Sequence, residues 1–328
     1  MSGDGLIHEV LNGFAKHADP IRAFRTPVAP IPTGSGNGTA LNLLGLQEGA
    51  DISAAALNIV KVMTIGFPMS TDVFSVTQGD NRVVSYMSQA IGLMAELDLG
   101  TEHLRFMGDK RFMYGFLRGV VQHRSCPVKV SIKVVESNKR KMISDLHSAR
   151  SEATNRIKSL HRQPLQDVAT DGGPKDTPSH ESTTAAHTSS LPPLVHRDQP
   201  QGEGWIVFDK RFMFLYAGKG PFVSRDLMQF PVSHPDDGYI DVVIQEQTTR
   251  KGMLQGIDGA ETGKNYWLET QHYFKAEAYR VEPHASDSYL SVDGERYPFE
   301  PYQVEVHRGL ATLLSPYGSY NAEFSLPE

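Results

Sequence analysis

Apolar residues recur at helical spacing near the start of the chain, and this pattern changes to strand-like runs after residue 70. Five positions follow the period of an amphipathic helix: Leu6, Ile7, Val10, Leu11 and Phe14. We expect this helix to end between Gly13 and Pro20, and residues 40–46 and 54–64 to form two more helices. Residues 1–69 are therefore predicted to alternate between turns and helices.

The second part of the chain is dominated by β-branched and aromatic runs that short polar turns separate. Residues 78–81 form a hairpin-type turn between strand-like runs at 73–77 and 82–97, and residues 104–121 return to helical spacing. The remaining strand-like runs are 128–135, 205–208, 212–216, 239–245, 273–281, 289–292 and 303–314. The last run either is a final strand or returns onto the first helices. Together these runs predict an antiparallel β domain.

Residues 137–202 differ in composition from both flanks. They are rich in Ser, Thr, Pro, His and Gln and contain almost no aromatic residues. Such a segment cannot bury enough apolar surface to offset the entropy that is lost on ordering. We therefore expect a disordered insertion at 137–202, between two parts of one β domain at 70–136 and 203–328.

The overall composition is that of a globular protein of 328 residues, with a formal net charge of -6 at pH 7. This charge gives no reason to expect nucleic-acid binding, which normally requires a basic surface. The sequence shows no apolar run long enough to span a bilayer and no signal peptide, so we expect a cytoplasmic protein. The single cysteine, Cys126, cannot form an internal disulfide and is expected to fill space in the core.

Two glycine-rich turns stand near the N-terminus. Gly3 and Gly5 flank Asp4 directly before the first predicted helix, and residues 32–37 form a second cluster. Glycine lets the backbone approach a ligand closely, and the free N–H groups and dipole of a helix start favour an anion. Two such turns close together in the sequence predict a phosphate site for one nucleotide.

The first glycine turn lacks the strand that normally precedes it in a βαβ unit, because only Met1 comes before residues 2–5. We therefore expect the nucleotide domain to be N-terminally truncated. Either the chain is a fragment or its start is misplaced.

Several motifs, taken in order, resemble the diacylglycerol kinase catalytic-domain superfamily and look closest to its sphingosine (long-chain base) kinases. The first is Ser-Gly-Asp-Gly at residues 2–5, followed by Leu6, His8 and the Asn-Gly pair at residues 12–13. Diacylglycerol kinases usually have Thr where this chain has Leu6, which favours the sphingoid branch. The later motifs are residues 34–37, 95–99, 105–112, 234–238, 278–283 and 292–295.

The resemblance implies a fold of the α/β plus β class. An incomplete, phosphofructokinase-like ATP-binding domain at residues 1–69 would be followed by an antiparallel β-sandwich-type lipid-binding domain. The implied activity is transfer of the γ-phosphate of ATP, with Mg²⁺, to the primary hydroxyl of a sphingoid base. A peripheral membrane surface is an expected partner, and a homodimer is left open. The alternatives are ceramide or diacylglycerol as the acceptor, and a catalytically incompetent binding module.

The resemblance also assigns roles to residues by position. The residues implied to line the reaction site are Ser2, Gly3, Asp4 and Gly5. Asp4 matches the residue that deprotonates or orients the acceptor hydroxyl, with Glu9 in support, and Asp98 matches the carboxylate that recognises the sphingoid amine. The implied ATP contacts are Gly34, Ser35, Gly36, Arg105, Arg111, Asp293, Gly294 and Glu295. No metal ligand is assigned.

Elementary chemistry qualifies the two carboxylates. For Asp4 the alternative role is a helix N-cap, and a helix start favours the ionised carboxylate, so no strongly raised pKa is expected. For Asp98 the alternative is a solvated turn acid. We expect the segment around Asp98 to be extended, with Glu96 facing away from it.

The segment that carries the two arginines allows three interpretations. Arg105 and Arg111 lie six residues apart, so a break near Gly108 would let both point into one cleft. The same segment contains a stripe of apolar residues: Leu104, Phe106, Met107, Phe112, Met113, Phe116 and Leu117. We expect this stripe to be mostly core, and the alternatives are a lipid-tail pocket and a membrane contact.

Overall fold

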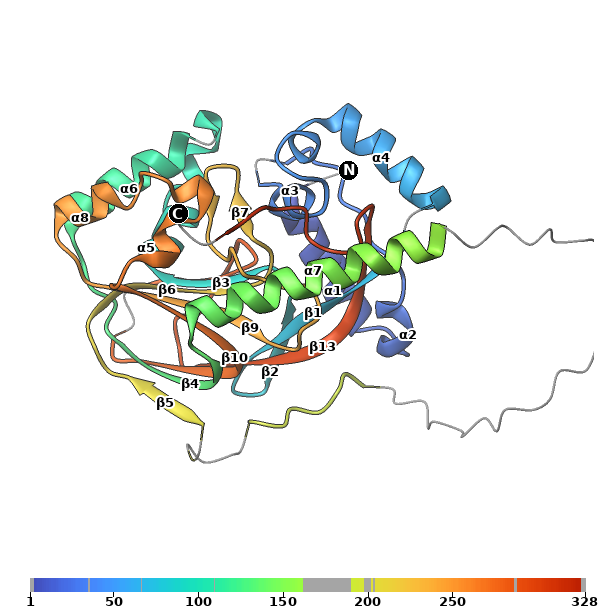
Figure 1. The fold of residues 1–328 in the computed structure, drawn as a ribbon. Coiled ribbons are helices and arrows are strands. Elements are labelled where there is room, and N and C mark those ends of the chain that lie inside the picture. Colours follow the sequence, from blue (N-terminus) through green and yellow to red (C-terminus); the bar gives the residue numbers. More distant parts are fainter. Residues whose placement is uncertain are drawn as a thin grey trace, which may run out of the picture.

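A curled antiparallel sheet of 11 strands forms the centre of the chain (Figure 1). The computed structural model describes residues 3–34, 36–65, 67–108, 110–161, 190–197, 202, 204–285 and 288–325. The strands are β1 (Phe67–Gln78), β2 (Asn81–Ser85), β3 (Ser88–Gly92), β4 (Val128–Glu136), β5 (Trp205–Phe208), β6 (Phe212–Gly218), β7 (Phe222–Ser224), β8 (Leu227–Met228), β9 (Ile240–Glu246), β10 (Gln271–Pro283), β11 (Leu290–Val292), β12 (Glu295–Tyr297) and β13 (Tyr302–Ser315). The strand order is β12-β11-β3-β6-β9-β10-β13-β1-β2, with β4 on β10 and β5 on β4, while β7 and β8 pair separately.

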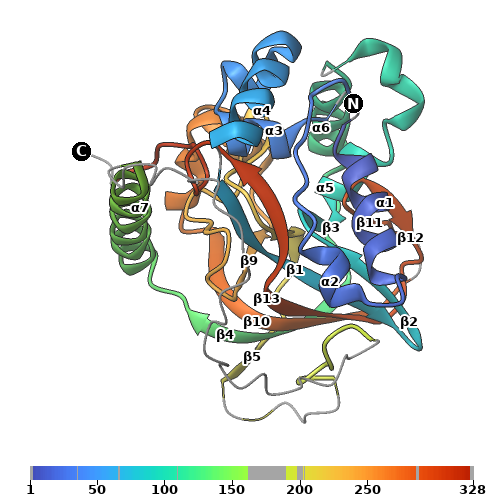
Figure 2. The ribbon, with the colours of Figure 1, turned by 90° about the vertical axis from the view of Figure 1, so that its right-hand side faces the viewer.

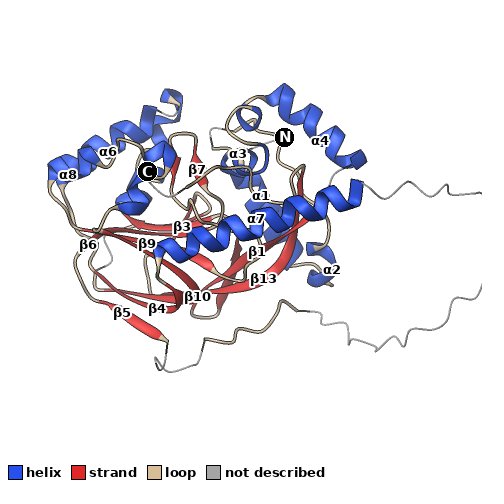
Figure 3. Ribbon diagram, in the orientation of Figure 1, coloured by secondary structure: helices blue, strands red, loops and turns tan. Residues whose placement is uncertain are grey.

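Helices surround this sheet (Figures 2 and 3). They are α1 (Asp4–Ala15), α2 (Pro20–Phe24), α3 (Gly38–Leu44), α4 (Ile52–Ile65), α5 (Leu93–Asp98), α6 (Lys110–Gln122), α7 (Lys139–His161) and α8 (Arg250–Gln255). Four short 3₁₀ turns complete the described elements: η1 (Glu48–Ala50), η2 (Glu102–Met107), η3 (Ala260–Thr262) and η4 (Lys264–Trp267). The predicted change from helices to an antiparallel sheet is therefore confirmed.

The sheet is buried on both faces near its centre, which explains the long apolar runs of the sequence. On β6, Leu215 and Ala217 point into the core inside the curl, whereas Phe214 points into a second core under α5, α6 and α8. The expected two-sheet sandwich is replaced by one continuous sheet. Its long strands bend at bulges, one on β1 between Thr71 and Val73 and others on β10, so the same strands serve both sides of the curl.

The N-terminal helices pack directly on the end of the sheet that β1, β2 and β13 form. Ile7 and Leu11 of α1 and Phe24 of α2 share a core with Val73 and Val84. Helix α2, which the sequence pattern did not predict, begins at Pro20, where the Asp19 side chain accepts a hydrogen bond from the Arg22 N–H and Pro20 occupies the first helical position.

A buried group of charges ties four parts of the sheet together. Lys219, at the end of β6, lies 2.9 Å from the Asp72 carboxylate on β1 and also contacts Asp237. Lys275 on β10 contacts Asp237 at 2.9 Å and Asp241 on β9 at 2.8 Å. The two lysines hold the pKa of Asp237 well below its usual range, although burial acts in the opposite direction. Asp237, in the predicted motif at residues 234–238, thus forms ion pairs with two buried lysines.

The prediction of a disordered insertion at 137–202 is wrong for its first part. Residues 139–161 form α7, which runs across one face of the molecule in Figure 1. Met142, Ile143 and Leu146 are buried on one side of this helix, and the Tyr266 hydroxyl donates to the Lys139 carbonyl at 2.7 Å. Three apolar residues in an otherwise polar helix are enough to attach it to the core, and composition alone does not reveal such a stripe.

Residues 190–197 are also placed, on the outer side of the sheet. The backbone N–H groups of Val195 and His196 donate to the Glu305 carboxylate on β13, and the Arg82 guanidinium donates to the Pro192 carbonyl at 2.7 Å. Residues 162–189, the centre of the predicted insertion, lie outside the described residues.

Two further predictions of secondary structure need correction. The expected strand run at 82–97 divides into β2, β3 and the helix α5. The expected helix at 104–121 divides into η2 and α6, with Gly108 between them at φ 59°. The predicted break near Gly108 is therefore confirmed, because only a residue without a side chain adopts this conformation readily.

Candidate functional site

The two glycine turns lie against each other, as their spacing predicts. The Asp4 N–H donates to the Gly36 carbonyl at 3.1 Å. A Cβ atom placed on Gly34 would stand 2.4 Å from the Gly3 Cα, and one placed on Gly3 would stand 2.6 Å from the Gly36 carbonyl oxygen. The two backbones touch so closely that only glycine fits at Gly3 and Gly34.

The Asp4 carboxylate caps a helix other than its own. Gly3 is the N-cap residue of α1, whereas the Asp4 carboxylate accepts the N–H groups of Gly38 at 2.7 Å and Thr39 at 3.1 Å, at the start of α3. Burial raises the pKa of Asp4, and the hydrogen bonds from Thr39 and Gly38 oppose this shift. The sequence predicted no strongly raised pKa for Asp4; the direction of the shift is upward, because desolvation between two helix ends outweighs the hydrogen bonds to the carboxylate.

Tyr86, after β2, fixes the backbone at this point. Its hydroxyl donates to the Asp4 carbonyl at 3.0 Å and lies 3.1 Å from the Thr39 hydroxyl. Tyr86 thus contacts the start of α1 through the Asp4 carbonyl and the start of α3 through the Thr39 hydroxyl.

The Asp293 carboxylate is buried and accepts five hydrogen bonds. Asp293 follows β11 and has φ 51°, a left-handed conformation that Asp adopts more readily than most residues. Its donors are His8 Nδ1 at 2.8 Å, the Ser85 hydroxyl at 2.8 Å, and the backbone N–H groups of Tyr86 at 3.1 Å, Met87 at 3.0 Å and Ser88 at 2.8 Å. Asp293 therefore connects the β11–β12 turn to α1 and to the turn between β2 and β3.

His8 is the contact between α1 and this carboxylate. Burial alone would lower the pKa of His8, but the hydrogen bond and charge of Asp293, with Glu295 and Glu9 nearby, raise it above its ordinary value. The other ring nitrogen faces the Tyr297 hydroxyl at 3.4 Å and the Asn12 amide at 3.3 Å. At lower pH His8 is thus protonated and forms an ion pair with Asp293. As the pH rises, the His8 imidazole loses this proton and becomes neutral.

Asp98 is the last residue of α5, so the expected extended segment is wrong. In a helix, residues two apart point to different sides, which separates Glu96 from Asp98; a strand would have placed both on one face. The buried Ser291 hydroxyl on β11 donates to the Asp98 carboxylate at 2.8 Å. The Arg111 guanidinium, stacked on Phe112, donates to the Asp98 carbonyl at 3.2 Å.

The turn of the β11–β12 hairpin lies next to both Asp4 and Asp98. A Cβ atom on Gly294 would be 3.9 Å from the Asp98 carboxylate, and one on Gly5 would be 3.6 Å from the Glu295 carboxylate. Figure 2 shows α1 lying beside β11 and β12. Tyr216 on β6 lies close enough to the carboxylates of Asp98, Asp293 and Asp4 for their charges to act on it. Burial, and to a smaller extent these charges, raise the pKa of its hydroxyl. The structure thus gathers residues from four distant parts of the sequence.

Some predicted site residues cannot be placed. Ser2 and Ser35 lie outside the described residues, as does the side chain of Arg105. Glu9 lies on the exposed side of α1. Their assigned roles stay predictions.

The apolar stripe before and along α6 is largely exposed, contrary to the expected core. Phe106 is 83% exposed and Val121 73%, and Met113, Tyr114 and Leu117 are also exposed. The opposite side of α6 packs tightly on α5: Gly115 and Gly119 leave space for Leu97 and Leu93. The glycines therefore hold one face of the helix on the protein while the apolar face remains open.

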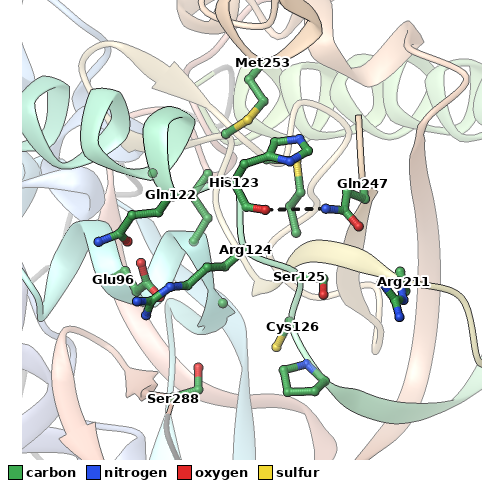
Figure 4. A pocket seen from close by; sticks show the side chains of 15 residues that line it. Glu96, Gln122, His123, Arg124, Ser125, Cys126, Arg211, Gln247, Met253 and Ser288 are labelled. Carbon is green, nitrogen blue, oxygen red and sulfur yellow. Dashed lines mark hydrogen bonds between the residues drawn. The ribbon is translucent and has the colours of Figure 1, made fainter. Parts of the chain in front are cut away.

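A cavity of about 390 Å³ lies on the far side of α5 from Asp4, Asp98 and Asp293 (Figure 4). Glu96, Arg124, Arg211 and Gln247 line it together with apolar residues, and Gln247 donates to the His123 carbonyl at 3.5 Å. Cys126 in its wall is buried, as expected, and burial raises the pKa of its thiol to about 12. The charged lining does not suit an alkyl chain, and a thiol with this raised pKa carries little reactive thiolate at neutral pH.

Within the described ranges, His, Cys, Asp and Glu side chains form no group of three or more arranged to hold a metal ion. No described helix has both the length and the apolar composition needed to cross a membrane.

Comparison with known proteins supports the kinase resemblance. Residues 1–69 match the diacylglycerol kinase catalytic domain. The chain is 30% identical to sphingoid long chain base kinase 4 of Schizosaccharomyces pombe, over 98% of this chain and 62% of that protein. It is 26% identical to sphingoid long chain base kinase 5 of Saccharomyces cerevisiae and 25% identical to human sphingosine kinase 2, covering 50% and 61% of those proteins. The resemblance to sphingoid-base kinases is confirmed.

This chain thus spans between half and two thirds of the sphingoid-base kinases with which it is compared. A putative diacylglycerol kinase from Bacillus anthracis has the same fold, with a TM-score of 0.54 and 18% identity over 96% of this chain and 76% of that one. The similarity of fold therefore extends over nearly the whole chain.

The sequence did not predict a role for several residues of the site. Tyr86, Tyr216 and Ser291 carry no motif of their own, and they are recognised only because the fold brings them beside Asp4, Asp98 and Asp293. His8 belongs to the first motif, but its position next to Glu9 does not indicate that its partner, Asp293, lies 285 residues away.

The contact between the two glycine turns leads to a stability prediction. Gly34→Ala should lower the free energy of unfolding by about 1–3 kcal/mol or more, because its Cβ overlaps the Gly3 backbone. Gly13→Ala is the matched control: it meets no atom within 4 Å inside α1 and should be neutral or stabilise by about 0.5–1 kcal/mol. Urea unfolding measures both. Equal effects of the two changes would show that the turns do not touch as described.

Proposed function

We propose that this chain is the catalytic part of an ATP-dependent kinase that phosphorylates a sphingoid long-chain base on its primary hydroxyl. The observation that carries the proposal is that Asp98 and the first turn of α1, at Gly5 directly after Asp4, both approach the β11–β12 turn. One carboxylate suits a hydroxyl that must lose a proton, and the other suits an ammonium. A sphingoid base carries both groups on neighbouring carbons.

The proposed reaction follows the general scheme of phosphoryl transfer. The acceptor hydroxyl oxygen forms a bond to the γ-phosphorus of ATP, the bond from that phosphorus to the β,γ-bridging oxygen breaks, and ADP leaves. The hydroxyl proton passes to the Asp4 carboxylate, whose pKa burial raises, so that it accepts a proton more readily than an exposed aspartate. Asp4 is oriented for this role by the N–H groups of α3.

ATP is proposed to bind where the two glycine turns meet. The turns bring the N-termini of α1 and α3 together. The Asp4 carboxylate occupies the start of α3, and the start of α1 would attract phosphate oxygens. We assign the nucleotide contacts to Gly34, Ser35, Gly36, Arg105, Arg111, Gly294 and Glu295. Asp293 is better described as their support, since its oxygens already accept five hydrogen bonds. Mg²⁺ normally binds largely through nucleotide phosphates and water; no protein ligand is assigned to it, and no step depends on one.

The decisive experiment is a kinase assay of the full-length gene product with labelled ATP, magnesium and sphinganine. Labelled sphinganine phosphate is expected, and Asp4→Asn should lower kcat by about 100-fold or more, because the proton acceptor is lost. Calorimetry with ATP on the same samples tests the alternative, namely that the chain is a catalytically incompetent binding module. A folded protein that yields no labelled lipid would refute the kinase, whether or not it binds ATP.

The acceptor class is tested at Asp98. Asp98→Asn should reduce kcat/KM for sphinganine about 10- to 100-fold, the effect of losing a charged partner, with a much smaller effect on a short-chain ceramide, which has no ammonium. Glu96→Gln, two residues earlier on the same helix, is the matched control and should leave both values unchanged. Equal losses on the two acceptors would favour ceramide or diacylglycerol as the acceptor.

A membrane surface is the proposed source of the lipid. Tyr114, Leu117 and Val121 repeat along the exposed face of α6, and exposed Phe106 lies at the same end of the molecule. A solvated protein rarely exposes an apolar stripe of this kind unless it contacts a partner or a lipid surface.

Co-sedimentation with phosphatidylcholine and phosphatidylserine vesicles tests this contact. The double change Leu117→Gln and Val121→Gln should weaken vesicle binding by roughly tenfold, since each buried CH₂ contributes about 0.8 kcal/mol. The control is Leu57→Gln with Val60→Gln, which removes equally exposed apolar side chains from α4. Binding that depends on α4 and not on α6 would contradict the proposal.

A further inference from the structure

The β11–β12 hairpin contacts both the Asp98 side chain and α1, the helix that begins at Asp4. Ser291 lies on β11, and Asp293 follows this strand in a left-handed turn with φ 51°. Ser291 donates to the Asp98 carboxylate, and Asp293 accepts from His8 on the helix that begins at Asp4. Both side chains are buried.

We propose that Ser291 and Asp293 are positioning residues that set the distance between the acceptor-recognising Asp98 and the catalytic Asp4. This inference rests on the proposed function. Neither residue contacts the reacting atoms in this scheme; each acts through the carboxylate or helix that it holds.

The chemistry of the acceptor makes this distance important. In a 2-amino-1-alcohol the ammonium and the reacting hydroxyl are attached to adjacent carbons, so the substrate cannot stretch to follow a misplaced carboxylate. Displacement of a reacting group by about 1 Å can cost on the order of 100-fold in rate. A rigid link between Asp98 and Asp4 is therefore worth more to this reaction than to one with a flexible acceptor.

The hairpin is built to be rigid. Asp293 receives three backbone N–H groups from the turn between β2 and β3, its own N–H donates to the Ser88 carbonyl at 2.7 Å, and β11 pairs with β3 on its other side. Tyr297 on β12 adds an edge contact to the His8 ring. Loss of a single anchor should thus shift one carboxylate without unfolding the hairpin.

The two anchors have different kinetic signatures. Ser291→Ala removes one hydrogen bond from the Asp98 carboxylate and should raise KM for sphinganine about five- to tenfold with kcat within about twofold, whereas Ser291→Thr, which keeps the hydroxyl, should restore KM. Asp293→Asn keeps the left-handed backbone but weakens the hold on His8, so kcat should fall at least about tenfold with KM within about twofold.

The experiment measures steady-state kinetics and thermal midpoints of the full-length gene product and its variants. Arg296→Ala, an exposed change on the same hairpin, is the control and should behave like the wild type. If Asp293→Asn does not fold, His8→Gln cuts the same link from α1. An inactive wild-type protein would overturn the proposed function and the inference with it. An active wild type with an unchanged KM in Ser291→Ala, or with kcat and KM changing together in both variants, would overturn the inference alone.

Discussion

The carboxylate of Asp293 is the constraint on which the site depends. A buried anion is costly unless hydrogen bonds replace its hydration, and here the donors come from two separate parts of the chain: His8 on α1 and the segment from Ser85 to Ser88, between β2 and β3. Each donor can be satisfied only if its segment occupies one position. The requirement to satisfy this one group therefore fixes where α1 lies on the sheet, and with it Asp4.

A second constraint couples α1 to α3. Helix starts leave N–H groups without partners, and the Asp4 carboxylate supplies the partners for α3 while the Gly36 carbonyl accepts the Asp4 N–H. The two helices thus cap each other across a contact that admits only glycine. The Asp4 carboxylate already offsets the positive end of α3, so the start of α1 is the helix end to which a phosphate is proposed to bind.

The sequence predicted what depends on local pattern. The period of Leu6 to Phe14 predicted α1, the turn at 78–81 predicted the β1–β2 hairpin, and the run at 303–314 predicted β13. It did not predict α7, because burial of Met142, Ile143 and Leu146 is decided by the surface on which the helix packs. The roles of His8 and Ser291 were likewise hidden, since their partners lie 285 and 193 residues away. Long-range pairing of polar groups leaves no periodic signal.

The electrostatics of the site also favour the acceptor class. Tyr216 lies near three carboxylates, Asp98, Asp293 and Asp4, which act together with burial to raise the pKa of its hydroxyl. His8 donates to Asp293, the start of α3 donates to Asp4, and the Ser291 hydroxyl donates to Asp98. In the proposed complex a substrate ammonium would place a positive charge beside these carboxylates, and a neutral lipid would not. Under the proposed function, the phosphates of ATP would need cations near these carboxylates, and the Arg111 guanidinium, which donates to the Asp98 carbonyl, is one.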